Sequence, residues 1–119
     1  MKIVLPWPDA RLSPNARVHH QVLAAAKKQA RKDGAYATLE AMHGRIGATR
    51  AHFAGDFGIP MRILFVPPDK RLRDADNALA SMKAYLDGIA DALAVNDERF
   101  RPSIEMCAPE RPCCVEVLV

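Results

Sequence analysis

The sequence predicts an α/β or α+β fold in which a small mixed sheet of about four strands packs against two or three helices. Apolar runs bounded by prolines alternate with Ala-rich and Leu-rich segments of helical periodicity, and such helices must bury their apolar faces against another layer. The chain has 119 residues, of which 50% are hydrophobic, and this suffices for one core but not for two. We therefore expect one domain over residues 1–119.

Four segments have the composition of strands. Lys2–Leu5 is a short run that must end at Pro6, because proline cannot donate a hydrogen bond to a neighbouring strand. Residues 61–66 form the clearest strand, with prolines on both sides. The last two strands, about 103–107 and 113–119, flank the turn-rich pentapeptide APERP and suggest a hairpin. The order of the strands in the sheet stays open.

Helical patterns in the first half begin at about Arg17, where an Ala-rich amphipathic segment starts. Asp33-Gly34 offers a stop or a break in this helix. Residues 35–53 keep a helical composition but contain Gly44 and Gly47. One long broken helix and two short helices are both compatible with that pattern.

The second half contains the strongest helical pattern of the chain. Its apolar residues recur at steps of three and four, at Leu79, Met82, Leu86, Ile89 and Leu93. Asp76 or Asn77 occupies the expected N-cap position, where a side-chain oxygen accepts a hydrogen bond from the first free backbone N–H groups. The sequence therefore predicts one helix from about residue 77 to residue 93.

Cysteines and apolar segments bear on where the protein is found. Cys107, Cys113 and Cys114 fit neither a paired disulfide framework nor a zinc-binding spacing. The apolar run before Pro6 is far shorter than a signal peptide requires, and no other segment approaches membrane-spanning length. We expect a soluble cytoplasmic protein that does not contact a membrane.

Charge is unevenly distributed along the chain. Residues 1–53 carry nine Lys or Arg and three Asp or Glu, whereas residues 54–119 carry eight and eleven. A basic half attracts phosphate and an acidic half gathers cations, although solvated surface charge produces the same asymmetry. The basic half contains candidate phosphate-binding side chains at Arg17, Lys27, Lys28 and Arg31.

Residues 67–100 contain the candidate catalytic groups. Asp74 and Asp76 are two residues apart between a strand and a helix, so extended backbone would point both carboxylates to one side. Such a pair favours a compensating Mg²⁺ or Mn²⁺ ion, although aspartates at this place are more often helix caps than metal ligands. Asp97 lies beyond a helix that would be roughly 24 Å long. It could join the pair only if the chain folds back or if a partner subunit supplies it.

Cations stand directly beside these aspartates. Lys70, Arg71 and Arg73 precede Asp74, and a phosphodiester-cleaving site needs cations for phosphate next to anions for metal. Lys83 stands seven residues after Asp76, almost two turns of a continuous helix, so it would project from the same face and could reach a phosphate. A solvent-facing helix lysine is the alternative interpretation of Lys83.

Several motifs resemble the RusA-like Holliday junction resolvases, which come mostly from phages and prophages. They are LPWP, NARVHH, RLRDADN, YLDGIADAL and VNDERF, and together they span nearly the whole chain. The resemblance implies a homodimeric endodeoxyribonuclease that uses Mg²⁺ or Mn²⁺ to nick four-way DNA junctions symmetrically in recombination and repair. It assigns metal binding and catalysis to Asp74, Asp76 and Asp97, and it places Asn77 in the same DNA-binding motif.

One position departs from the family pattern, and two other functional classes stay open. The family's catalytic lysine stands four residues after the second aspartate, where this chain has Ala80, so Lys83 is the candidate for that role. A protein that binds junctions or other structured DNA without cleaving them is the first alternative, and metal-dependent nicking would exclude it. A hydrolase of RNA or of smaller nucleotides is the second, and preference for junctions over duplex DNA would exclude it.

Overall fold

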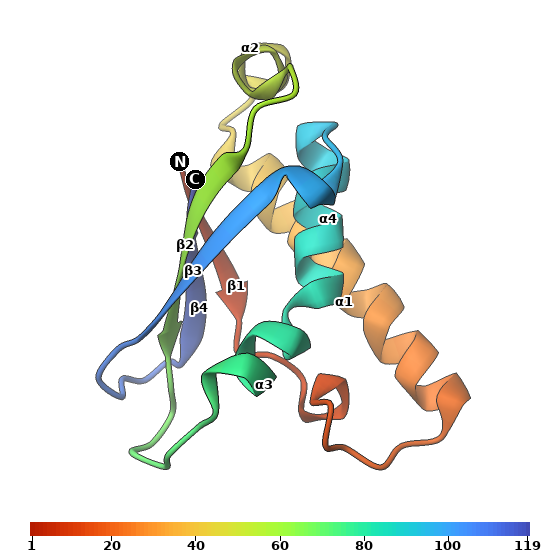
Figure 1. Cartoon of the computed structure of the whole chain (residues 1–119), viewed down its shortest axis with the longest axis vertical. Coiled ribbons are helices and arrows are strands. Elements are labelled where there is room, and N and C mark those ends of the chain that lie inside the picture. The colour runs from red at the N-terminus through yellow and green to blue at the C-terminus, as the bar shows by residue number, and fades with distance from the viewer.

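The computed structural model describes all 119 residues as a four-stranded mixed sheet with helices gathered on one of its faces (Figure 1). The predicted α+β fold class is confirmed, with four α-helices in place of two or three. In chain order the elements are β1 (Lys2–Pro6), the 3-10 helix η1 (Ala10–Leu12), α1 (His20–Ala41), α2 (Ile46–Phe53), β2 (Ile59–Val66), α3 (Ala75–Ser81), α4 (Lys83–Leu93), the 3-10 helix η2 (Asp97–Arg99), β3 (Phe100–Met106) and β4 (Cys114–Leu118).

The sheet has the strand order β1-β4-β2-β3. Strand β4 runs antiparallel to both β1 and β2, whereas β3 is parallel to β2. Ile3 and Ile63 both lie opposite Val117 in this register, and all three side chains are fully buried. Alternate residues of β1, β4 and β2 therefore form the sheet side of the core.

The predicted hairpin between the last two strands is wrong, because β2 lies between β3 and β4. The connecting segment crosses the end of β2, where Cys107 donates its N–H to the carbonyl of Phe65 and Glu110 donates to that of Pro67, at 2.8 and 3.0 Å. Turn-forming residues signal that the chain reverses direction. They do not specify which strand becomes the neighbour.

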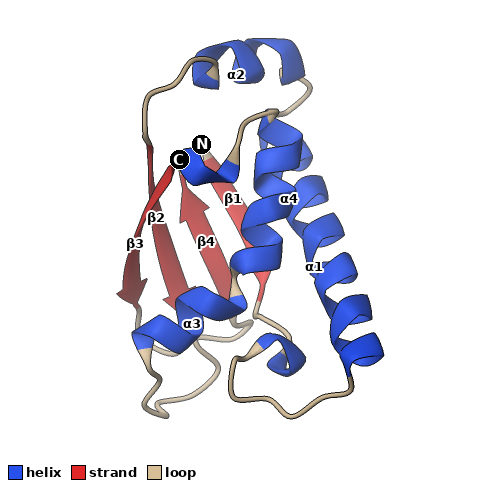
Figure 2. Ribbon diagram, turned by 45° about the vertical axis from the view of Figure 1, so that its right-hand side comes forward, coloured by secondary structure: helices blue, strands red, loops and turns tan.

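Helices α1 and α4 lie side by side and approach each other closely at two glycines (Figure 2). A Cβ atom added to Gly34 would lie 2.2 Å from the carbonyl oxygen of Tyr85, and one added to Gly88 would lie 2.0 Å from that of Arg31. The prediction that Asp33-Gly34 ends the first helix is therefore wrong. Gly34 keeps helical backbone, and its missing side chain lets the two helix backbones touch.

Two helix boundaries also differ from the predicted ones. The helix expected from residue 77 to residue 93 divides at the fully buried Met82, and Asp74 replaces Asp76 or Asn77 as its N-cap. In the first half, His43 and Gly44 adopt left-handed backbone with φ of 50° and 79°. This turn separates α1 from α2, so the segment forms two helices rather than one.

The core is one cluster of buried side chains between the sheet and the helices. Phe100, which begins β3, belongs to it, and Trp7 packs edge-on against Phe65 with ring centroids 6.0 Å apart. All three cysteines are free. None of the helices has the length and apolar character needed to cross a membrane.

The contact between α1 and α4 predicts that Gly88→Ala destabilises the fold by about 1–3 kcal/mol, because the new methyl group would collide with a helix backbone that cannot move aside alone. Urea unfolding followed by circular dichroism measures this change. Gly47→Ala is the matched control, since nothing lies within 4 Å of a Cβ built there in α2. Equal stability of the two variants would contradict the close contact.

Candidate functional site

Asp74 is placed by the start of α3. It has extended backbone with φ −73° and ψ 126°, and its Oδ1 accepts hydrogen bonds from the backbone N–H groups of Asp76 and Asn77 at 2.8 and 3.3 Å. Asp76 lies in the first turn of α3 and is exposed. Neither carboxylate forms an ion pair, so both keep oxygens that could bind a cation.

The loop that leads into α3, residues 67–74, is fixed by Arg73. The Arg73 guanidinium donates to Oδ1 of Asp69 at 2.9 Å and lies over the ring of Trp7, 5.2 Å from its centroid. Hydrogen bonds from the backbone N–H of Arg71 and from Arg73 hold the pKa of Asp69 below its ordinary value. Arg73 is thus engaged inside the molecule, whereas Lys70 and Arg71 are exposed to solvent.

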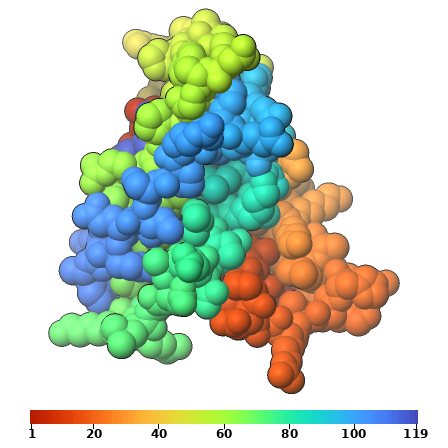
Figure 3. Space-filling model, in the orientation of Figure 1, coloured from red at the N-terminus to blue at the C-terminus, as the bar shows by residue number.

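The tip of the same loop is apolar. Leu72 is 98% exposed, the most exposed large hydrophobic side chain of the chain, and it lies between Arg71 and Arg73 in the sequence. Figure 3 shows residues 67–74 protruding in light green at the lower left, beside α3. Single exposed apolar side chains are common on protein surfaces, so Leu72 marks a contact surface only if a partner covers it.

Lys83 begins α4 and binds two carboxylates. Its Nζ lies 2.7 Å from Oδ1 of Asp87, one turn further along the helix, and it also donates to Oδ2 of Asp97. The hydrogen bonds to Asp87 and Asp97 raise the pKa of Lys83, and the hydrogen bond from Lys83 lowers the pKa of Asp97. Lys83 therefore links two carboxylates, and its ammonium group and the Asp97 carboxylate stabilise each other's charged form.

Asp97 reaches Lys83 because the chain folds back after α4. Ala94 ends the helix in left-handed backbone with φ 57°, and the side chain of Asn96 accepts the N–H of Glu98 at 2.9 Å to start η2. The expectation that Lys83 shares a helix face with Asp76 is wrong, because the helix divides at Met82. Lys83 faces Asp97 instead.

The three predicted metal-binding aspartates are not gathered into one group. Asp74 and Asp76 lie at the start of α3, whereas Asp97 is paired with Lys83 beyond that helix. No set of three or more His, Cys, Asp or Glu side chains is close enough together to hold an ion. Asp74 and Asp76 suit a hard divalent ion by their chemistry, and Asp97 could join them only after leaving Lys83.

A basic cavity of about 810 Å³ opens between α1 and the α3–α4 junction. The structure brings four of the predicted phosphate-contacting or catalytic side chains to its walls, namely Lys27, Lys28, Arg31 and Lys83. Arg31 forms a bidentate ion pair with Asp91 at 2.6 and 2.8 Å, whereas Lys27 and Lys28 have no acidic partner. Arg17, Lys70 and Arg71 lie outside this cavity.

Lys83 also lines a second, smaller cavity, of about 490 Å³, together with Asp97, Leu79 and Phe100. It therefore stands at the boundary between the basic cavity and the carboxylate of Asp97. Sequence reasoning missed Arg11 and Asp87, which also line the basic cavity. The spacing of four residues between Lys83 and Asp87 was the available signal for the second of these.

Comparison with known proteins finds no family model that matches the chain. An uncharacterized protein of Xylella fastidiosa (strain Temecula1 / ATCC 700964) is 46% identical over 105 residues, which cover 87% of this chain and 65% of the relative. The chain thus spans about two thirds of the relative's length, and the relative's name says nothing about activity.

The N-cap geometry predicts that Asp74→Ala lowers the free energy of unfolding by about 1 kcal/mol, because two backbone N–H groups lose their acceptor. Asp74→Asn should be nearly neutral, since asparagine caps helices equally well while removing the charge. Chemical denaturation of both variants measures the difference. If both substitutions destabilise equally, charge rather than capping dominates at this position.

The Lys83 cluster predicts that Lys83→Met raises the pKa of Asp97 toward about 3.9, the value of an unpaired aspartate. Because pairing depresses this pKa in the folded state, its stabilising effect is present above about pH 3.9 and is lost as the pH falls through the folded pKa. Carboxyl ¹³C NMR titration measures the shift, with Lys32→Met as the control. An unchanged Asp97 pKa in Lys83→Met would contradict the pairing.

Proposed function

We propose that the chain is a metal-dependent endodeoxyribonuclease that resolves four-way DNA junctions by paired nicking, in recombination and repair in the cytoplasm. The observation that carries this proposal is that Lys83 lines a basic cavity and is paired with the carboxylates of Asp87 and Asp97. Metal-dependent hydrolysis of a phosphodiester needs anions for the metal ion, and cations beside them can hold the phosphate. The motifs of residues 71–77 and 95–100 support the same function.

The basic cavity supports binding of a DNA backbone. Lys27 and Lys28 are free of acidic partners, so each can exchange counterions for a phosphate and add to a salt-dependent affinity. The charge of Arg31 is already neutralised by Asp91, so Arg31 forms part of the cavity wall but adds little net charge to it. In this proposal these side chains hold the strand, and Arg17, Lys70 and Arg71 contact phosphates further out.

Asp74, Asp76 and Asp97 would hold Mg²⁺, or Mn²⁺ in its place. Such an ion supplies a water of lowered pKa and neutralises negative charge that develops on the phosphate. Lys83 would respond first to the DNA. Its ammonium group can exchange the Asp97 carboxylate for an entering phosphate, because the carboxylate and the phosphate are both anions. That exchange would free the Asp97 carboxylate at the moment when DNA arrives.

Leu72 extends the proposal to branched DNA. Apolar side chains that proteins insert between base steps unstack the bases, and junctions offer such exposed steps at the branch point. Leu72 has the required exposure and lies beside the exposed cation Arg71. A symmetric homodimer completes the proposal, since paired nicks on opposed strands need two sites related by a twofold axis.

The test is cleavage of a synthetic four-way junction in Mg²⁺, Mn²⁺ or EDTA by the wild type and by Asp76→Asn. Asp76 is the chosen position because it is exposed and does not cap α3, so its substitution leaves the fold intact. We expect symmetric nicks only with metal and a loss of roughly a hundredfold or more in Asp76→Asn. Asp56→Asn, which changes an exposed aspartate elsewhere, is the matched control.

Junction binding is measured in parallel by gel shift in EDTA. Binding that persists in Asp76→Asn while cleavage disappears supports the nuclease. A wild type that binds junctions tightly but never cuts them in either metal would replace it with the non-cleaving DNA-binding alternative. If duplex DNA competes for the protein as well as junction DNA does, the proposed preference for four-way junctions is wrong.

A further inference from the structure

A separate cavity lies between α2 and the paired ends of β1 and β4. Figure 1 shows α2 at the end of the molecule opposite α3. Its volume is about 830 Å³, within the range of about 300–1,000 Å³ that is typical of sites for small molecules. Met42 and Phe53 are buried and give it an apolar base, to which Met1 and Val119 add. It shares no residue with the cavities around Lys83.

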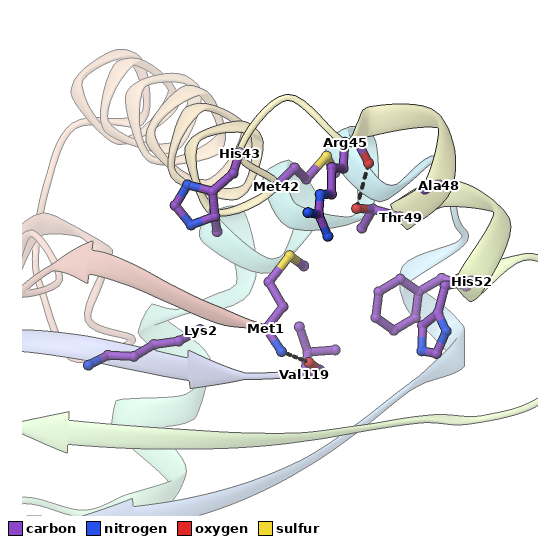
Figure 4. Close-up of a pocket in the computed structure, with 11 residues that line it drawn as sticks. Met1, Lys2, Met42, His43, Arg45, Ala48, Thr49, His52 and Val119 are labelled. Atoms are coloured by element: carbon purple, nitrogen blue, oxygen red, sulfur yellow. Dashed lines mark hydrogen bonds between the residues drawn. The ribbon is translucent and has the colours of Figure 1, made fainter.

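The polar side chains of this cavity are basic or neutral. Lys2, His43, Arg45, Thr49 and His52 line it, and no Asp or Glu does. Lys2 is paired with Glu116 at 3.3 Å, whereas the Arg45 guanidinium has neither an ion pair nor a hydrogen bond. Figure 4 shows the Arg45 side chain extending from its loop toward Met1, with His43 on one side and His52 on the other.

Local structure fixes the backbone that carries these groups. The left-handed turn at His43 and Gly44 reverses the chain after α1 and brings Arg45 over the ends of the strands. Thr49 then donates its hydroxyl to the carbonyl of Arg45 at 2.7 Å. The ring of Phe53 stands at 87° to that of His52, with centroids 4.8 Å apart, and so orients the imidazole. The backbone of Arg45 and the ring of His52 are therefore held before a ligand binds, whereas the Arg45 guanidinium is free to turn toward it.

We propose that this cavity binds a nucleotide, with its phosphate at Arg45 and its base in the apolar part beside His52. The guanidinium fork matches two phosphate oxygens, and no Asp or Glu side chain of the cavity competes for it. Bases stack on flat side chains, and His52 offers such a face next to an apolar base. The bound nucleotide is either a free mononucleotide or the end of a DNA strand, since both present this chemistry.

The experiment is isothermal titration of the wild type, Arg45→Gln and Arg111→Gln with dAMP, deoxyadenosine and inorganic phosphate. Arg111 is exposed and lies in the loop before β4, away from the cavity. Its substitution therefore removes the same charge without touching the proposed site. We expect dAMP to bind the wild type more tightly than either fragment of it. Arg45→Gln should weaken dAMP by about tenfold or more through loss of a charge-assisted hydrogen bond, whereas Arg111→Gln should stay within about twofold.

Amide chemical-shift changes in NMR spectra locate the bound nucleotide without any measurement of cleavage. Shifts at Thr49 and His52 that depend on Arg45 support the proposal, whereas no dAMP binding, or binding that Arg45→Gln leaves unchanged, overturns it. A short DNA single strand with a 5′-phosphate is titrated in the same way, and its Arg45-dependent shifts are compared with those of dAMP. The comparison shows whether the cavity binds a strand end or a free nucleotide. Tighter binding of the strand supports a strand end, and equal or weaker binding supports a free nucleotide.

Discussion

The contact of α1 with α4 at Gly34 and Gly88 is the constraint on which the rest of the structure depends. Backbone atoms of the two helices touch there, so their separation is set by the backbones themselves rather than by flexible side chains. Thr38 is buried in α1 and satisfies its hydroxyl on the carbonyl of Gly34 at 2.7 Å, which leaves no polar group unpaired beside this contact. The position of α4 follows, and with it the positions of Lys83 at its start and of Asp97 beyond its end.

The same contact explains why the basic and acidic halves of the chain meet. Arg31 of α1 reaches Asp91 of α4 only because the helices are this close, and the basic cavity is the space that remains where they separate toward α3. Lys83 lines that space together with the lysines of α1, and it is paired there with two carboxylates. Charge that is segregated along the sequence is thus brought face to face by packing.

Local patterns allowed the fold class to be predicted from the sequence, along with the strands near residues 2–5 and 61–66. The spacing of apolar residues and the placement of prolines involve only neighbouring residues, so they indicate helices and strands whatever the tertiary structure. Strand neighbours were not predictable, because the parallel pairing of β3 with β2 depends on how the helices cover the sheet. Gly34 misled for a related reason, since a glycine that ends a helix and one that permits close packing look alike in sequence.

The candidate site was also predictable only where it depends on neighbouring residues in the sequence. Asp74 and Asp76 fall at one helix start, as their spacing indicated, whereas the partner of Asp97 could not be inferred. Its contact with Lys83 depends on the break at Met82 and on the left-handed Ala94, and neither has a distinctive sequence signal. Arg73 shows a further limit, because its engagement with Asp69 and Trp7 is a tertiary contact that its motif does not reveal.

Strand β3 has a consequence for how two copies of the chain can meet. It forms one edge of the sheet, and Pro102 stands within it, so the outer row of backbone donors is interrupted there. A strand from another molecule cannot extend the sheet regularly along that edge. Assembly on this side must therefore use side chains on a face or a loop, and the sheet edge itself is protected against uncontrolled growth.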